Sequence, residues 1–135
     1  MVGQTVSSFQ LSEGRFKLDV VVVQMGQDLS VCLFGGDRPH IGSVALAVPR
    51  PSLRAPAIRS ATASVLNVVG HKEDRLTRSA AEQLAAGLGC VVSVAAGIHY
   101  DDLDDPGIET ICRLVQDVVD RVLAQYQDRT GDDPV

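Results

Sequence analysis

The spacing of apolar residues changes its period along the chain, and this change limits the possible folds more than any other feature. Before about residue 70, apolar residues run in β-branched blocks or alternate with polar ones, as in residues 16–25 (FKLDVVVVQM) and 29–34 (LSVCLF). That is the period of a β-strand. From about Glu73 to Leu88 they recur four apart, which is the period of a helix. Strands followed by helices indicate an α+β domain.

The boundaries of the expected elements follow from turn and cap residues. Short Gly/Asp turns predict hairpins, and Asp104-Asp105-Pro106 is typical of a helix start. In the order β-β-β-β-α-β-α, the expected strands are 16–25, 29–34, 40–48, 60–69 and 90–98, and the expected helices are 73–88 and 105–125.

We therefore expect a mostly antiparallel sheet of about five to six strands, covered by two helices. If both helices cover one face, the Val-rich opposite face stays exposed. An exposed apolar sheet face usually marks an interface, and a homodimer is the simplest arrangement that buries one.

The length of 135 residues fits a single domain, 1–135, with a core at about 8–126 and a flexible acidic tail at 127–135. Hydrophobic residues make up 45% of the chain, which is enough for a packed core. The net charge of −5 argues against nucleic acid or an anionic membrane as a partner. No apolar run reaches the roughly 18 residues that a membrane span needs.

Cysteine usage bears on the compartment. Cys32, Cys90 and Cys112 each have apolar neighbours, and none forms a CxxC pair. This pattern predicts buried free thiols in a reducing cytoplasm. The stretch MVGQTVSSFQ lacks the basic and apolar regions of a signal peptide, which also predicts a cytoplasmic protein.

The richest candidate for a site is GGDRPHIG, residues 35–42. Backbone N–H groups of Gly35 and Gly36, together with Arg38, can cradle an anion. A turn that needs glycine explains the same glycines equally well. The additional His40 and Gly42 favour a site, because a plain turn needs no such residues.

Three histidines, His40, His71 and His99, stand beside glycines at the expected strand ends. If their loops converge, they can bind a zinc-like ion together with Asp101 or Glu73. Without a compact motif such as HExxH, histidines that only fill hydrogen-bonding roles explain the pattern as well.

Hydroxyls and a lysine complete the set of candidates. Ser60, Thr62 and Ser64 alternate and so share one strand face, where they can bind a phosphate or form an ordinary polar surface. Lys72 can pair with a phosphate or remain a solvated lysine. No nucleophile with an adjacent base is readable, so we expect neither catalytic residues nor a resident metal.

Three segments together resemble one family. GGDRPHIGSVALAVPRPS, SATASVLNVVGHKED and AGIHYDDL resemble the prenylated-flavin chaperone family, also called the D subunit of gallate-type decarboxylases, over about Phe16 to Val122. The family is similar in architecture to proteasome assembly chaperones, which are small dimeric α+β proteins. The resemblance implies a non-catalytic accessory protein that handles prenylated FMN or FMN for a prenyl-FMN-dependent decarboxylase acting on aromatic acids.

From their chemistry, the residues expected to contact the phosphate or the ring edge are Gly35, Gly36, Arg38, His40, Gly42, Ser60, Thr62, Ser64, His71, Lys72 and His99. Two alternatives remain open: a small metal-dependent enzyme built on His40, His71 and His99, and an assembly chaperone that binds only protein.

Overall fold

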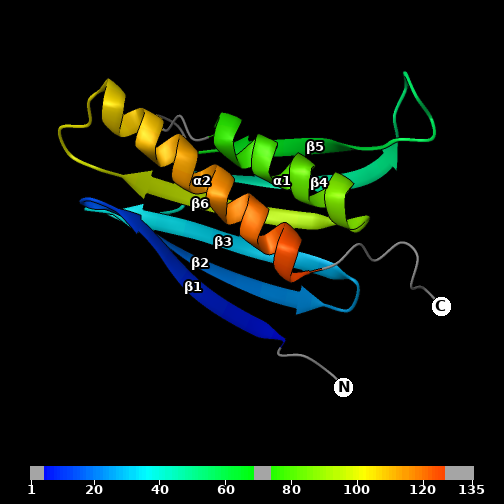
Figure 1. The fold of residues 1–135 in the computed structure, drawn as a ribbon, viewed down its shortest axis with the longest axis horizontal. Coiled ribbons are helices and arrows are strands. Elements are labelled where there is room, and N and C mark those ends of the chain that lie inside the picture. The colour runs from blue at the N-terminus through cyan, green and yellow to red at the C-terminus, as the bar shows by residue number, and fades with distance from the viewer. Residues whose placement is uncertain (1–4, 69–73, 127–135) are drawn as a thin grey trace.

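The computed structural model describes residues 5–68 and 74–126, which form one six-stranded sheet and two helices. The strand order is β1-β2-β3-β6-β4-β5, and every neighbouring pair is antiparallel except β3 and β6, which run parallel (Figure 1). The elements in chain order are β1 (Val6–Glu13), β2 (Phe16–Met25), β3 (Asp28–Gly36), β4 (Ser43–Pro51), β5 (Arg59–Asn67), α1 (Asp74–Leu88), β6 (Val92–His99) and α2 (Asp105–Gln125).

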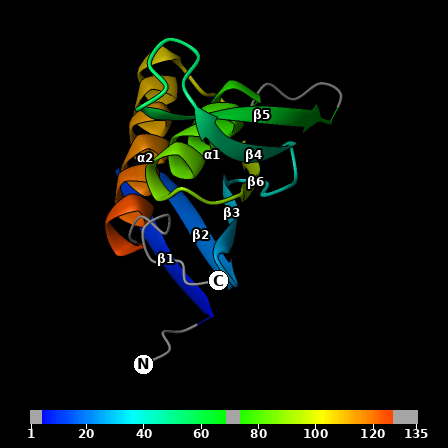
Figure 2. The same cartoon turned by 90° about the vertical axis from the view of Figure 1, so that its right-hand side faces the viewer.

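Both helices pack on the same face of the sheet (Figure 2). Alternate strand residues point toward them, and Leu18, Val20 and Val22 of β2 are fully buried there. The helices contribute small and β-branched side chains at helical spacing, such as Ala81 and Val119. The core is aliphatic because the sequence supplies few aromatic residues.

No helix of the described residues covers the opposite face of the sheet, which we call the uncovered face. Leu46 and Val48 are each 48% exposed there, and Leu66 is 79% exposed. The strand register places on it neutral side chains in the middle and charged ones toward the ends. The neutral ones are Val21, Val23, Ser30, Cys32, Phe34, Val44, Leu46, Val48, Thr62, Ser64, Leu66, Ser93 and Ala95, and the charged ones include Lys17, Asp19 and Arg50.

The α+β class, the mostly antiparallel sheet and the two covering helices are confirmed. The structure adds β1, whose VSSFQLSE sequence carries too few apolar residues to stand out. It also places β6, the last strand in sequence, between β3 and β4. The stretch Ser79–Glu82, which matches a capping box, lies inside α1.

The strand expected to stop at residue 48, before Pro49 and Pro51, is longer in the structure: β4 continues through Pro49 and ends at Pro51. The N–H of Ser52 points toward β5, where it donates to the carbonyl of Ile58 at 2.8 Å. Because successive residues alternate, the nitrogens of both prolines point away from β5. β6 pairs with β4 only as far as Ala47, so no ladder hydrogen bond is lost.

Two of the three cysteines differ from the expectation of burial. Cys90 is buried, whereas Cys32 lies exposed on the uncovered face and Cys112 lies exposed on α2. Apolar neighbours in sequence do not determine burial, because adjacent strand residues point to opposite faces. All three are free.

None of the helices within the described residues is both long and apolar enough to cross a bilayer. The expected acidic tail, 127–135, lies outside the described residues.

Candidate functional site

The candidate site lies at the end of the sheet where β3 and β6 finish. These strands are parallel and in register, with Gly36 opposite His99. The segments that follow them, residues 37–42 and 100–104, therefore leave the same edge of the sheet. We call the side chains of Asp37, Arg38, His40, His99 and Asp101 the edge cluster.

Glycines in the 35–42 segment permit very close backbone approach. Gly36 has a φ of +96°, and a Cβ at that position would lie 2.0 Å from the carbonyl oxygen of His99. In β6, a Cβ on Gly97 would lie 1.6 Å from the carbonyl oxygen of His40. Only glycine fits at these positions. Packing of the loop across β6 thus accounts for these glycines without a ligand.

Backbone hydrogen bonds fix the loop at both ends. The Asp37 N–H donates to the His99 carbonyl at 2.7 Å, which extends the β3–β6 pairing by one residue. The Gly42 N–H donates to the Ala96 carbonyl at 2.9 Å. Arg38, Pro39, His40 and Ile41 are therefore presented by a loop with two fixed ends.

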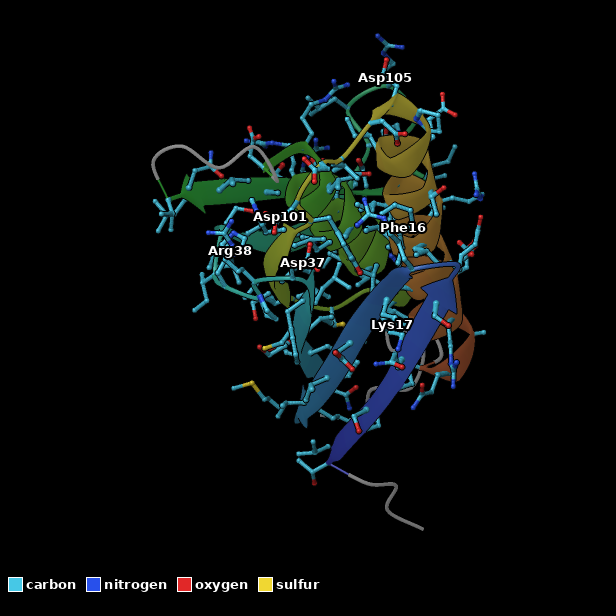
Figure 3. The ribbon with its side chains drawn as sticks, turned by 90° about the vertical axis from the view of Figure 1, so that its left-hand side faces the viewer. Phe16, Lys17, Asp37, Arg38, Asp101 and Asp105 are labelled. Carbon is cyan, nitrogen blue, oxygen red and sulfur yellow. The ribbon has the colours of Figure 1, made fainter. Side chains whose placement is uncertain are left out.

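Asp101 is the centre of the edge cluster. Figure 3 labels it together with Asp37 and Arg38. Its Oδ1 accepts a hydrogen bond from Arg38 Nη2 at 2.9 Å and lies 3.0 Å from His99 Nε2. Its backbone N–H donates to Asp37 Oδ2 at 2.9 Å. The hydrogen bonds from Arg38 and His99 hold the pKa of the Asp101 carboxyl below its ordinary value.

The cluster borders two open hollows. One, of about 320 Å³, is lined by Arg38, His40, Ile41 and His99. The other, of about 270 Å³, is lined by Gln10, Arg15, Lys17, Asp19, Gly35, Gly36, Asp37, Pro39 and Tyr100. Alternate residues of the loop line different hollows, so the loop separates them.

Tyr100 lines the second hollow and is held in place by contacts with β2. Its hydroxyl donates to the Lys17 carbonyl at 2.9 Å and accepts from the Lys17 N–H at 2.6 Å. Its ring packs edge-on against Phe16, and the Arg15 guanidinium lies 5.4 Å from the ring centroid. These contacts join the end of β6 to the start of β2.

Six of the expected site residues gather at this end of the sheet: Gly35, Gly36, Arg38, His40, Gly42 and His99. Ser60 and Thr62 do not join them. Asn67 of β5 pairs with Ser43, close to the loop, and Ser60 lies seven residues earlier. At roughly 3.3 Å per residue, that is about 23 Å along the strand.

The hydroxyls of β5 have other surroundings. The Thr62 hydroxyl accepts a hydrogen bond from Arg50 Nε at 2.6 Å. Ser64 is exposed on the uncovered face, opposite Leu46. His71 and Lys72 lie outside the described residues, and their assignment stays a prediction.

From the sequence, Asp101 is expected only as a metal partner, and Asp37, Arg15, Lys17 and Tyr100 are not expected at the site. Sequence alone hides their proximity, because it depends on the parallel pairing of β3 with β6. Within residues 5–68 and 74–126, no three His, Cys, Asp or Glu side chains are grouped so as to hold a metal ion. A site that also uses His71 stays untested.

Within the described residues, then, this is an α+β protein with a polar cluster and shallow hollows at one sheet end, and an apolar face without a cover. The model of the prenylated flavin chaperone LpdD-like domain matches residues 12–127, and the chain belongs to that family.

No curated protein matches the sequence. Among solved structures, a chain from a crystal structure of a chaperone complex for yeast 20S proteasome assembly is similar to this one. The TM-score is 0.45 at 13% identity, and the match covers 92% of this chain and 100% of that chain.

Proposed function

We propose that this protein binds prenylated FMN, or FMN, transiently at the edge cluster and handles it for a prenyl-FMN-dependent decarboxylase of aromatic acids. It does not carry out decarboxylation itself. Membership of a prenylated flavin chaperone family supports the cofactor class. The observation that carries the proposal is the hollow where Arg38, His40 and His99 meet the apolar side chain of Ile41.

The phosphate of the cofactor fits Arg38. A guanidinium has five N–H donors in a planar fork that suits phosphate. Arg38 donates to Asp101 and is still 72% exposed, so donors remain for a ligand. The nearby carboxylates of Asp37 and Asp101 weaken the attraction for an anion. Weak binding suits a protein that must release its cargo.

The ring and its prenyl group need apolar surface, and the hollow has an apolar margin. Ile41 lines the hollow and is 64% exposed. The N–H of the exposed Val68 donates to the carbonyl of Gly42, so Val68 lies beside the loop. Burying apolar ligand surface here contributes about 25 cal/mol per Å².

Calorimetric titration with FMN and with prenylated FMN tests this function. We expect saturable binding that is about tenfold weaker in Arg38→Ala, because a charge-assisted contact is lost. Arg54→Ala is the matched control, since Arg54 lies in the β4–β5 connection at the other end of the sheet. Absence of binding at about 1 mM ligand would contradict the proposal.

We propose further that the protein forms a homodimer through the uncovered face, in a cytoplasm where its three free cysteines stay reduced. The described side chains of that face carry no charge in its central rows, such as Val21, Cys32, Ala95, Val44 and Leu66. A neutral apolar patch has no like-charge repulsion with its own copy, whatever the net charge of the chain. A second copy therefore fits it.

The uncovered face also favours a second candidate function, an assembly chaperone that binds only protein. In that case His40→Ala and Arg38→Ala keep full activity in a decarboxylase maturation assay, whereas a charge on the uncovered face abolishes it. Loss of activity in the loop variants supports cofactor handling instead.

A further inference from the structure

β4 and β5 continue together beyond the rest of the sheet. β6 pairs with β4 only over Ser43 to Ala47, whereas the β4–β5 pairing continues to Pro51 opposite Arg59. We call residues 48–62 the arm. Figure 1 shows its tip projecting at the right, at the end of the sheet away from the edge cluster.

The tip of the arm is ordered by its own hydrogen bonds. The Ser52 N–H donates to the Ile58 carbonyl, and the Ile58 N–H donates to the Ala55 carbonyl, both at 2.8 Å. The Ser52 hydroxyl accepts from the N–H of Arg54 at 3.2 Å. Pro51 and Pro56 further restrict the backbone. A loop with one conformation loses little entropy when it docks.

The arm is also fixed close to its tip, at Arg59, the first residue of β5. Arg59 donates from Nε to the Ala86 carbonyl at 2.6 Å and from Nη2 to the Gly87 carbonyl at 3.1 Å. These carbonyls belong to the last turn of α1, where a cation is favourable. The direction of the arm is therefore set by the helix.

The tip presents apolar and positive groups that residues 5–68 and 74–126 leave exposed. Leu53 is 89% exposed and Ile58 is 63% exposed. Arg54 makes no ion pair with any carboxylate of the described residues, and Arg50 donates to neutral oxygens, those of Thr62 and Pro51. The sequence has no Asp or Glu from residue 38 through 72, although the chain carries a net charge of −5.

We propose that the arm tip docks on an acidic surface of the decarboxylase, with Leu53 in an apolar recess and Arg54 beside a carboxylate of that enzyme. The identity of the partner rests on the proposed function. Arginine is enriched in interface hot spots, and an exposed apolar side chain such as Leu53 gains free energy when a partner buries it. Nucleic acid fits less well, because the net charge is negative and the arm has no aromatic residue.

The test measures association with the purified decarboxylase by biolayer interferometry at low and high salt. Arg54→Glu is expected to weaken binding at least about tenfold at low salt, chiefly through slower association, and to reduce the salt dependence. Leu53→Ser is expected to speed dissociation and leave the salt dependence unchanged. Arg75→Glu, at the opposite end of α1, makes the same charge change and should bind as the wild type does.

Four results would overturn the docking proposal. These are absence of a complex, equal weakening by Arg54→Glu and Arg75→Glu, duplex DNA binding that Arg54→Glu abolishes, and a loss of self-association in Arg54→Glu. Flavin titration of the same variants separates the two proposals. If docking needs Arg54 but no flavin binds, cofactor handling fails and docking stands. If flavin binds but no complex with the decarboxylase forms, the docking proposal fails and flavin binding stands.

Discussion

At the scale of single residues, Gly97 shows how the backbone shapes the site. A Cβ there would overlap the carbonyl of His40, which is backbone and cannot rotate away. We expect Gly97→Ala to lower the free energy of unfolding by about 2 kcal/mol or more, as overpacking does, measured by urea denaturation.

Gly26→Ala is the matched control for this change. Nothing lies within 4 Å of a Cβ at Gly26, but its φ is +64°. Gly26→Ala therefore lowers the free energy of unfolding only because alanine must adopt a left-handed backbone conformation, which costs roughly 1–2 kcal/mol. If Gly97→Ala loses no more unfolding free energy than Gly26→Ala, the 37–42 loop moves to accommodate the added Cβ at little cost.

Asp101 gives a pH prediction at the same scale. Its folded-state pKa lies below the ordinary value of about 3.9. The cluster therefore contributes stability above that value and loses it as the pH falls through the lower, folded-state pKa. In an NMR titration, we expect Arg38→Ala to raise the pKa of Asp101. Arg113→Ala, which breaks the ion pair with Glu13, is expected to leave it unchanged.

At the scale of elements, the start of α2 depends on one side chain. Asp104 Oδ1 accepts from the Gly107 N–H at 2.9 Å, and Pro106 stands in the first turn. We expect Asp104→Ala to cost about 1 kcal/mol of unfolding free energy, because a helix N–H loses its acceptor.

Asp104→Asn keeps an acceptor and is expected to restore most of the stability. Asp105→Ala removes an equal charge from the same turn and is expected to cost less, because only the interaction with the helix dipole is lost. Chemical denaturation of the three variants measures these free energies of unfolding. Equal losses of stability in all three would argue against a capping role for Asp104.

At the scale of the whole molecule, the uncovered face predicts the oligomeric state. We expect the wild type to be a dimer by sedimentation equilibrium and Leu46→Glu to be a monomer, because it places a charge in the centre of that face. Leu53→Glu, on the arm, should remain dimeric. A monomeric wild type would remove the homodimer from the proposal.

The amino-acid sequence by itself determines most of the elements of this protein. Period-two apolar runs, turn glycines and the Asp-Pro start of the last helix are local features, and they place β2 and α2 at the residues where the structure has them. β1 escapes prediction because it lies at the edge of the sheet and needs only Phe9 and Leu11 for packing.

Only the tertiary structure decides which elements become neighbours. Whether β6 adds beside β5 or enters between β3 and β4 depends on burial on the helix-bearing face and not on any local pattern. That insertion brings His99 opposite Gly36 and assembles the edge cluster, while Ser60 and Thr62 go to the other end of β5. The glycines of GGDRPHIG follow from the same pairing, since the parallel strands and the crossing loop leave no room for a Cβ.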